Sequence, residues 1–347
     1  MSKVNFTKCF LVLLLLLSAC SKPAPIYQEQ AYVFGTLVEI SIVGESDARA
    51  RLATSAVIQE FQRLHNLLHA WKASELSALN TAISQKKTLT VSPEIFSILQ
   101  STTQISTQSD GLFNPSIGGL IQIWGFQADE FKAVLPDQNS LQRLLVANPK
   151  MTDLIFGDDN KISSRNSAVQ LDLGGYAKGY ALDRAADILK QLNIHNALVN
   201  IGGNVLAIGK HGDRDWRVGI QHPRKPGPLA TLTLHDGDAI GTSGDYQRFF
   251  EINGKRYCHL IDPRDGYPVQ GVQAVTILTH GKTAGLLSDA SSKPLFIAGV
   301  TGWRAAAQQM KISEALLIDD RGVVHLTTTM HNRLEFTDQT VALDIQP

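Results

Sequence analysis

The chain has 347 residues, of which 44% are hydrophobic and 18% charged, with 32 basic and 32 acidic side chains. This mixture is typical of a globular protein with a large core, and it excludes a disordered chain, a collagen-like repeat and a disulfide-stapled miniprotein. Because the charge is balanced and no basic run occurs, nothing in the composition favours nucleic-acid binding.

The first twenty residues have the features of an export signal. Two lysines precede the apolar run 9–17, which is too short for a bilayer span of about 20 residues. Leu17-Ser18-Ala19-Cys20 resembles a bacterial lipobox, in which the signal is cut before the cysteine and the cysteine carries acyl chains such as palmitate. The alternative is a plain secretory signal with an incidental cysteine. We predict a lipoprotein signal peptide over 1–19, a lipidated Cys20 and tether over 20–30, and an exported, periplasmic, membrane-anchored protein.

Hydrophobic periodicity predicts a mixed series of strands and helices. A strand is expected over 32–43, followed by amphipathic helices over 46–69 and 93–108. Further expected elements are strands at 153–156, 168–173, 197–201, 205–208 and 216–220 with a helix over 177–192 among them, a hairpin at Asn253-Gly254, a strand at 273–279, a helix over 295–310, and strands at 315–318 and 322–326. No repeat and no Pro/Ser-rich linker divides residues 31–347, so we predict a single mixed α+β domain.

Three glycine-containing clusters are candidates for binding a phosphorylated ligand. Asp172–Gly179 joins a predicted strand to a predicted helix, where glycines admit a close ligand, free helix N–H groups face an anion, and Lys178 adds a cation. A tight turn with a surface lysine is the alternative. The cluster Asn200–Asn204 joins two predicted strands and is interpreted as a hairpin or a bulge. The cluster Gly241–Tyr246 is interpreted either as a phosphate site or as a turn. Together they favour a phosphorylated ligand without naming it.

Two further segments carry acid, base or metal-ligand chemistry. His259 and Asp262 lie at the end of a predicted strand, where the imidazole is either a proton shuttle or a structural side chain in a turn. Asp289 has serines nearby, and carboxylate and hydroxyl oxygens are ligands that suit Mg²⁺. The alternative is that these residues are an N-capping cluster for a helix following Pro294. Zinc and serine-hydrolase motifs are absent from the sequence.

Over roughly residues 30–325 the chain resembles the ApbE family, the FAD:protein FMN transferases, because its motifs occur in the same order as those of that family. The matching stretches are Phe34-Gly35-Thr36, Ser74–Asn80, Asp110–Gly118, Trp124-Gly125-Phe126, Asp172–Gly179 continuing to Asp183, Gly202-Gly203, Thr242–Tyr246, His259–Gly266, and Asp289 with Leu295–Gly299 behind it. Each stretch alone is weak evidence, whereas their common order is specific.

The resemblance implies an enzyme that moves the FMN half of FAD onto a Ser or Thr hydroxyl of a partner protein, releases AMP and uses Mg²⁺. The implied partners are flavin-carrying subunits of membrane redox complexes, of the Na⁺-translocating NADH:quinone reductase or Rnf type. His259 would deprotonate the acceptor hydroxyl, and Asp289 would hold Mg²⁺ together with a carbonyl near Ala177. The remaining FAD-site residues implied are Trp71 beside the flavin, Gly174, Gly175, Lys178, Asp183, Thr242, Ser243, Gly244 and Asp262.

One departure from the family pattern bears on the metal. The family has a Thr four residues after the metal Asp, and Lys293 stands there in this chain. Lys293 has replaced the charge of the metal, or points outward while Ser291 or Ser292 supplies the hydroxyl, or contacts a phosphate directly. The same departure leaves two rival functions, a non-catalytic FAD-binding lipoprotein and an FAD pyrophosphatase.

Overall fold

The computed structural model describes residues 24–128, 130 and 133–346. The predicted signal peptide and Cys20 lie outside the described residues. The tether predicted over 20–30 is corrected at its end, because the first strand, β1, covers Ile26–Val33. In the described part of the chain, no helix combines the length and apolar composition needed to cross a membrane.

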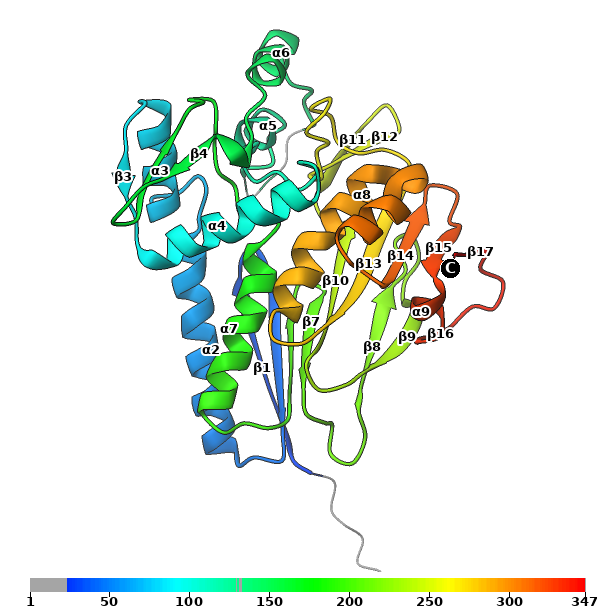
Figure 1. The fold of residues 1–347 in the computed structure, drawn as a ribbon. Coiled ribbons are helices and arrows are strands. Elements are labelled where there is room, and N and C mark those ends of the chain that lie inside the picture. The colour runs from blue at the N-terminus through cyan, green and yellow to red at the C-terminus, as the bar shows by residue number, and fades with distance from the viewer. Residues whose placement is uncertain (1–23, 129, 131–132, 347) are drawn as a thin grey trace, which may run out of the picture.

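The main sheet has nine strands in the order β1-β2-β6-β7-β10-β13-β14-β15-β17 (Figure 1). Every neighbouring pair is antiparallel except β15 and β17. Its strands are β1 (Ile26–Val33), β2 (Thr36–Val43), β6 (Ala197–Ile201), β7 (Asn204–Ile208), β10 (Asp238–Gly244), β13 (Val272–His280), β14 (Glu314–Asp319), β15 (Val324–Thr327) and β17 (Leu343–Gln346). The smaller sheets consist of β3 (Leu89–Thr90), β5 (Lys161–Ser164) and β4 (Leu154–Phe156); β11 (Phe249–Ile252) and β12 (Lys255–Cys258); and β16 (Leu334–Phe336), β9 (Pro228–Leu234) and β8 (Trp216–Gln221).

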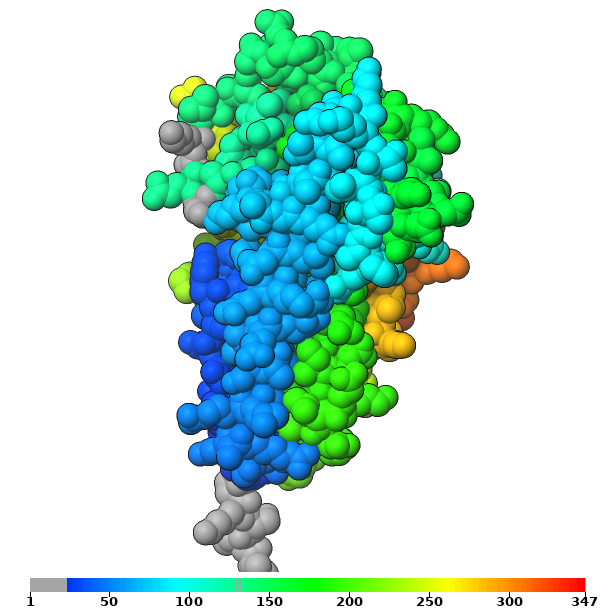
Figure 2. Space-filling view, turned by 90° about the vertical axis from the view of Figure 1, so that its left-hand side faces the viewer, coloured from blue at the N-terminus to red at the C-terminus, as the bar shows by residue number. Residues whose placement is uncertain are grey.

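Three long helices cover one face of the main sheet. They are α2 (Asp47–Leu67), α7 (Ala177–Gln191) and α8 (Ala284–Gln309). The first two lie side by side in Figure 2, and their apolar residues share a core cluster with β2, β6 and β7. The other helices are α3 (Glu75–Ser84), α4 (Pro93–Gln108), α5 (Gly118–Ile123), α6 (Gln138–Ala147) and α9 (Thr328–His331), with a 3₁₀ turn at Met151–Asp153. A second cluster joins the opposite face to β8 and β9.

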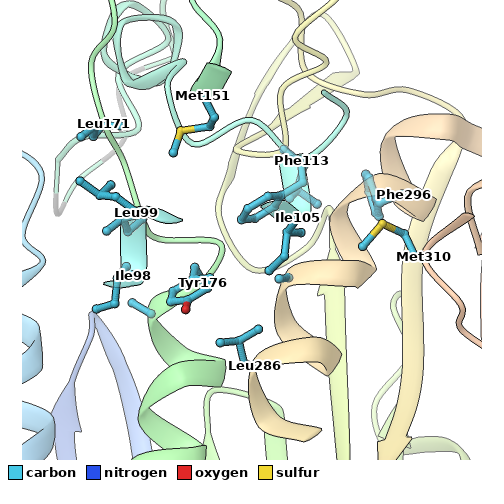
Figure 3. Packing of buried hydrophobic residues seen from close by; sticks show 14 of the residues in the cluster. Ile98, Leu99, Ile105, Phe113, Met151, Leu171, Tyr176, Leu286, Phe296 and Met310 are labelled. Carbon is cyan, nitrogen blue, oxygen red and sulfur yellow. The ribbon is translucent and has the colours of Figure 1, made fainter. Parts of the chain in front are cut away.

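Helix α4 packs against the N-terminal ends of α7 and α8. Its Ile98, Leu99 and Ile105 belong to one core cluster with Tyr176 and Leu286 (Figure 3). The helix begins as predicted, because Ser92 accepts from the Ile95 N–H and Pro93 occupies the first turn, where its missing N–H costs nothing. The core therefore fixes the two helix segments on which the glycine-rich loop and Asp289 lie.

The segment 32–43 is extended as predicted, but it is not one strand, because it contains the end of β1, a turn at Phe34-Gly35 and the whole of β2. Phe34 and Gly35 both have positive φ, 57° and 70°, as a two-residue turn of the primed type requires. The hairpins at Gly202-Gly203 and Asn253-Gly254 are confirmed by the same signature, with all four residues at positive φ.

The strand predicted over 168–173 is also wrong, since only an isolated bridge between Gln170 and Ile117 forms there. The Asn80 side chain takes the place of a neighbouring strand. Its amide donates to the Leu171 carbonyl (2.9 Å) and accepts from the Leu171 N–H (2.7 Å). The segment thus has extended backbone whose hydrogen bonds are satisfied without a ladder.

Helix α8 begins eleven residues before the predicted start at 295, so Pro294 lies inside it and Gly299 interrupts it with φ 68°. Asp289 is therefore a helical residue, and the alternative of an N-capping cluster is excluded. Gly241–Gly244 is likewise not a turn but the end of the central strand β10. The predictions also miss α3, α5, α6, α9, β3, β5, β9, β16 and β17.

Candidate active site

Glycines allow α7, α8 and β10 to approach so closely that a side chain would not fit between them. A Cβ on Gly179 of α7 would lie 2.6 Å from the Cβ of Asp289, and one on Gly241 of β10 would lie 2.6 Å from the Ser288 carbonyl carbon. Both separations are shorter than any ordinary contact. The close approach places the first half of α8 directly against the N-terminal turn of α7.

Asp183 anchors the beginning of α8 from the neighbouring helix. Its two carboxylate oxygens accept from the N–H groups of Gly285 (2.8 Å) and Leu286 (3.0 Å). Burial raises the pKa of Asp183 to about 7, against the effect of these two hydrogen bonds. Asp183 was predicted at the FAD site; in the structure both of its oxygens are engaged in holding α8 in position.

Asp289 is fully buried and contacts both the glycine-rich loop and Lys293. Its Oδ2 accepts from the Gly179 N–H (2.9 Å), and its Oδ1 accepts from the Lys293 ammonium. The ammonium also donates to the Asp289 main-chain carbonyl (2.7 Å). Although burial works in the opposite direction, the charges of Lys293 and Lys178 bring the pKa of Asp289 below its usual value. Lys293 therefore points inward, which excludes the outward orientation considered above.

The loop before α7 brings several predicted residues to this pair. Asp172 Oδ1 accepts from the Gly174 N–H (3.0 Å), which shapes the turn. A Cβ on Gly175 would lie 3.3 Å from Lys293 Cε, so the bare glycine gives room to the lysine stem. Ala177 begins α7 immediately beyond, and Lys178 acts electrostatically on both members of the pair. Gly174, Gly175, Ala177, Lys178, Asp289 and Lys293 thus form one cluster.

His259 follows β12 and is kept neutral by its surroundings. Burial, with the positive charges of Arg248, Lys178 and Lys293, lowers its pKa to about 3. Its Nδ1 lies 3.2 Å from the Arg248 carbonyl, which can only accept a hydrogen bond, so Nδ1 carries the proton. The unprotonated Nε2 is therefore the atom able to accept a proton at neutral pH.

The two hydroxyl residues predicted on β10 face opposite sides of the sheet. Ser243 Oγ lies 2.7 Å from Ser292 Oγ, which in turn donates to the Asp289 carbonyl, so Ser243 belongs to the cluster. Thr242 pairs across the strand with Thr276 (2.9 Å) on the other face. At Gly244, a Cβ would overlap the Tyr246 ring.

Asp262 and Trp71, two further residues predicted at the FAD site, have other partners than the Asp289–Lys293 pair. Asp262 is held by the guanidinium of Arg264, which also donates to the Ile297 carbonyl of α8 (3.2 Å). Trp71 is 38% exposed and stands edge-on to His69, with ring centroids 4.6 Å apart. Its exposure leaves an aromatic face available for stacking.

Buried polar atoms without a partner occur in one residue that the sequence did not single out, Gln127, and in two that lie in segments it did, Asn204 and Ser291. Among the described residues these are Gln127 Oε1, both amide atoms of Asn204, and Ser291 Oγ. Asn204 lies at the start of β7, two residues before Leu206, so the two side chains point to the same face of the sheet. Leu206 packs in the core cluster under α2 and α7, and Asn204 therefore faces the helices. No spacing in the sequence distinguishes Gln127 from an ordinary polar residue.

The fold and the cluster define a class of protein: a mixed α+β protein with a cationic, glycine-rich cluster where two helices meet a central strand. The model of the ApbE family matches residues 34–317, and the chain belongs to that family. The chain is 40% identical over 313 residues to an FAD:protein FMN transferase of Rhodobacter capsulatus, covering 90% of this chain and 59% of the relative, which is less than two thirds of the relative's length.

Two further similarities cover nearly the whole of the matched proteins. An FAD:protein FMN transferase of Klebsiella pneumoniae is 30% identical over 320 residues, covering 90% of this chain and 94% of the relative. The crystal structure of the ApbE protein of Thermotoga maritima has a TM-score of 0.81 and 29% identity, covering 89% of this chain and 99% of that chain. The family and the mixed α+β fold expected from the sequence are confirmed.

The residues around Asp289 do not fit the Mg²⁺ ion that the resemblance implied. One carboxylate oxygen accepts from an ammonium and the other from a main-chain N–H. In the described part of the chain, no group of three or more His, Cys, Asp and Glu side chains is placed to hold a metal ion. With Lys178 acting on the same carboxylate, the local charge favours an anion rather than a second cation.

Proposed function

We propose that this chain transfers the FMN part of FAD to a Ser or Thr hydroxyl of an acceptor protein and releases AMP. The observation that carries the proposal is the His259 imidazole, whose Nδ1 is engaged by the Arg248 carbonyl and whose Nε2 is left to accept a proton in the positive field of Lys178 and Lys293. A neutral base next to surplus positive charge suits a reaction in which a hydroxyl loses a proton near a pyrophosphate. The names of the two relatives above support the same activity.

The chemistry is a phosphoryl-type transfer. The acceptor oxygen forms a bond to the FMN phosphorus, and the bond from that phosphorus to the bridging oxygen breaks. AMP leaves with the bridging oxygen, and the hydroxyl proton passes to His259 Nε2 and then to solvent. The pyrophosphate is positioned by loop N–H groups and Lys178, while Trp71 offers a ring for the flavin to stack on.

The proposal includes a place and a partner for the reaction. The lipobox-like sequence supports export to the periplasm and anchoring to a membrane through Cys20. The acceptor is then a flavin-carrying subunit of a membrane redox complex of the Na⁺-translocating NADH:quinone reductase or Rnf type, as the resemblance implies.

The test uses residues 21–347 without the lipid, incubated with FAD and a flavin-acceptor domain. We expect AMP release and an acceptor band that fluoresces in the gel, both lost in His259→Ala. The matched control is His195→Ala, because His195 is exposed and lies in the turn after α7. AMP without a fluorescent acceptor would instead indicate an FAD pyrophosphatase, and FAD bound but intact would indicate a flavin-binding lipoprotein.

A further inference from the structure

The Lys293 ammonium occupies two oxygens of the kind that a hard divalent cation would use. It donates to Asp289 Oδ1 and to the Asp289 main-chain carbonyl, the latter at 2.7 Å. An ammonium has three N–H donors. The described residues provide acceptors for two of them, so the third remains for a ligand.

The surroundings hold the ammonium in place. Its stem packs against Gly175, where a Cβ would lie 3.3 Å from Cε, and only 13% of its side chain is exposed. Asp289 is fixed from its other side by the Gly179 N–H. Because the pair is buried, a divalent ion binding at Asp289 would have to displace Lys293 and leave its charge uncompensated beside Lys178.

The net charge of the cluster indicates what it binds. One carboxylate, Asp289, lies in the field of two ammonium groups, those of Lys178 and Lys293. One negative charge therefore stands against a surplus of positive charge. The N-terminal end of α7 adds to that field. A pyrophosphate compensates the surplus, whereas Mg²⁺ increases it.

We propose that the ammonium of Lys293 takes the place of a divalent cation on Asp289 and binds the pyrophosphate of FAD, so that FAD binding and FMN transfer proceed without a metal. This inference rests on the function proposed above. In the transfer, the FMN phosphorus gains the acceptor oxygen and loses the bridging oxygen to AMP. Lys293 offsets the negative charge that accumulates on the departing AMP phosphate, and the hydroxyl proton leaves through His259.

The first measurement is FAD binding to the wild-type protein by calorimetry, in EDTA and in Mg²⁺. We expect the same affinity in both, and no heat when Mg²⁺ alone is titrated into the FAD-free protein. Wild-type FAD affinity that falls tenfold or more in EDTA and returns with Mg²⁺ would overturn the proposal, as would tight Mg²⁺ binding by the FAD-free protein. These titrations need no variant, so they decide the question even if a substitution prevents folding.

The second measurement uses Lys293→Thr, with Lys190→Thr as the control, because Lys190 is an exposed lysine in the last turn of α7. In EDTA, loss of one charged hydrogen-bond donor should weaken FAD binding by roughly ten- to hundredfold in Lys293→Thr. Added Mg²⁺ should restore part of that loss, while Lys190→Thr should behave as wild type throughout. Unchanged FAD affinity of a folded Lys293→Thr in EDTA would contradict the proposal.

The two proposals fail in different ways. AMP and fluorescent acceptor formed only with Mg²⁺ would keep the transferase and reject the role of Lys293. FAD held equally well in EDTA, with no AMP under any condition, would reject the transferase and keep Lys293 as the metal-independent pyrophosphate ligand.

Discussion

Strand β10 has a cluster of charged side chains near each end, and the two clusters differ in how completely their charges are paired. At its first residue, Asp238 binds both His280 (2.6 Å) and Arg333 (3.0 Å), and Glu314 also pairs with His280 and Arg333. Two acids face two bases, and each base has two partners. Toward the other end, the buried carboxylate of Asp289 has one ion-pair partner, Lys293, and also lies in the positive field of Lys178.

The two histidines at these ends show the consequence. Against the effect of burial, hydrogen bonds with Asp238 and Glu314 raise the pKa of His280. Burial together with neighbouring cations lowers the pKa of His259 to about 3. Complete pairing gives a cluster that stabilises the sheet, whereas incomplete pairing leaves positive charge available for an anionic ligand.

Removing the acid should test this contrast most strongly. Asp289→Ala leaves the Lys293 ammonium buried without its carboxylate, and breaking such a pair costs about 3–5 kcal/mol of unfolding free energy. Asp238→Ala should cost roughly 1–2 kcal/mol, because His280 and Arg333 retain Glu314. Urea unfolding of both variants gives the two values. Equal losses would show that the pairing at the two ends is equivalent.

The close approach of α7 and α8 gives the next largest effect. Gly179→Ala places a Cβ 2.6 Å from that of Asp289, which should cost about 1–3 kcal/mol by displacing α8. It should also weaken FAD binding, since the Gly179 N–H holds Asp289. The control is Gly157→Ala, where the nearest atom would lie at 3.5 Å. Urea unfolding and FAD calorimetry are the measurements, and a stable Gly179→Ala protein with unchanged FAD affinity would contradict this packing argument.

The sequence predicts the elements with their own periodicity and caps, and it misses those defined by distant partners. Helix α4 is predicted at both ends because Ser92 and Pro93 mark its start locally. The start of α8 is missed because Asp183, about a hundred residues earlier, caps it, while Pro294 suggests a false start. The strand predicted over 168–173 is extended but pairs with the side chain of Asn80.

The candidate site follows the same rule. The glycine-rich loop could be predicted because glycines before a helix, followed by a lysine, have a local meaning. The Asp289–Lys293 pair could be given only as one of three alternatives, because its spacing of four becomes a contact only once the segment is helical. The separation of Thr242 from Ser243 likewise required knowing that β10 is a strand.

The pH dependence of stability should separate the two histidines. Since the pKa of His259 is lowered from 6.5 to about 3, the unfolded chain binds a proton there that the folded protein does not, between these two pH values. Its contribution to stability therefore falls as pH decreases below 6.5. Relative to His259→Gln, wild type should lose about 1–2 kcal/mol of unfolding free energy between pH 6.5 and 5. Parallel pH profiles for the two proteins would contradict the assigned burial of His259.

His280 should give the smallest effect, with the opposite sign. Its pKa is raised in the folded protein, so its stabilising contribution is complete below the unfolded value near 6.5 and is lost as pH rises through the folded value. Because 49% of its side chain is exposed, solvent screening limits the loss to less than about 1 kcal/mol. Urea unfolding from pH 6 to 9 should show wild type losing stability relative to His280→Gln. If wild type instead loses stability only below pH 6, the pairs with Asp238 and Glu314 do not raise the pKa of His280. The contrast between the two ends of β10 would then be rejected.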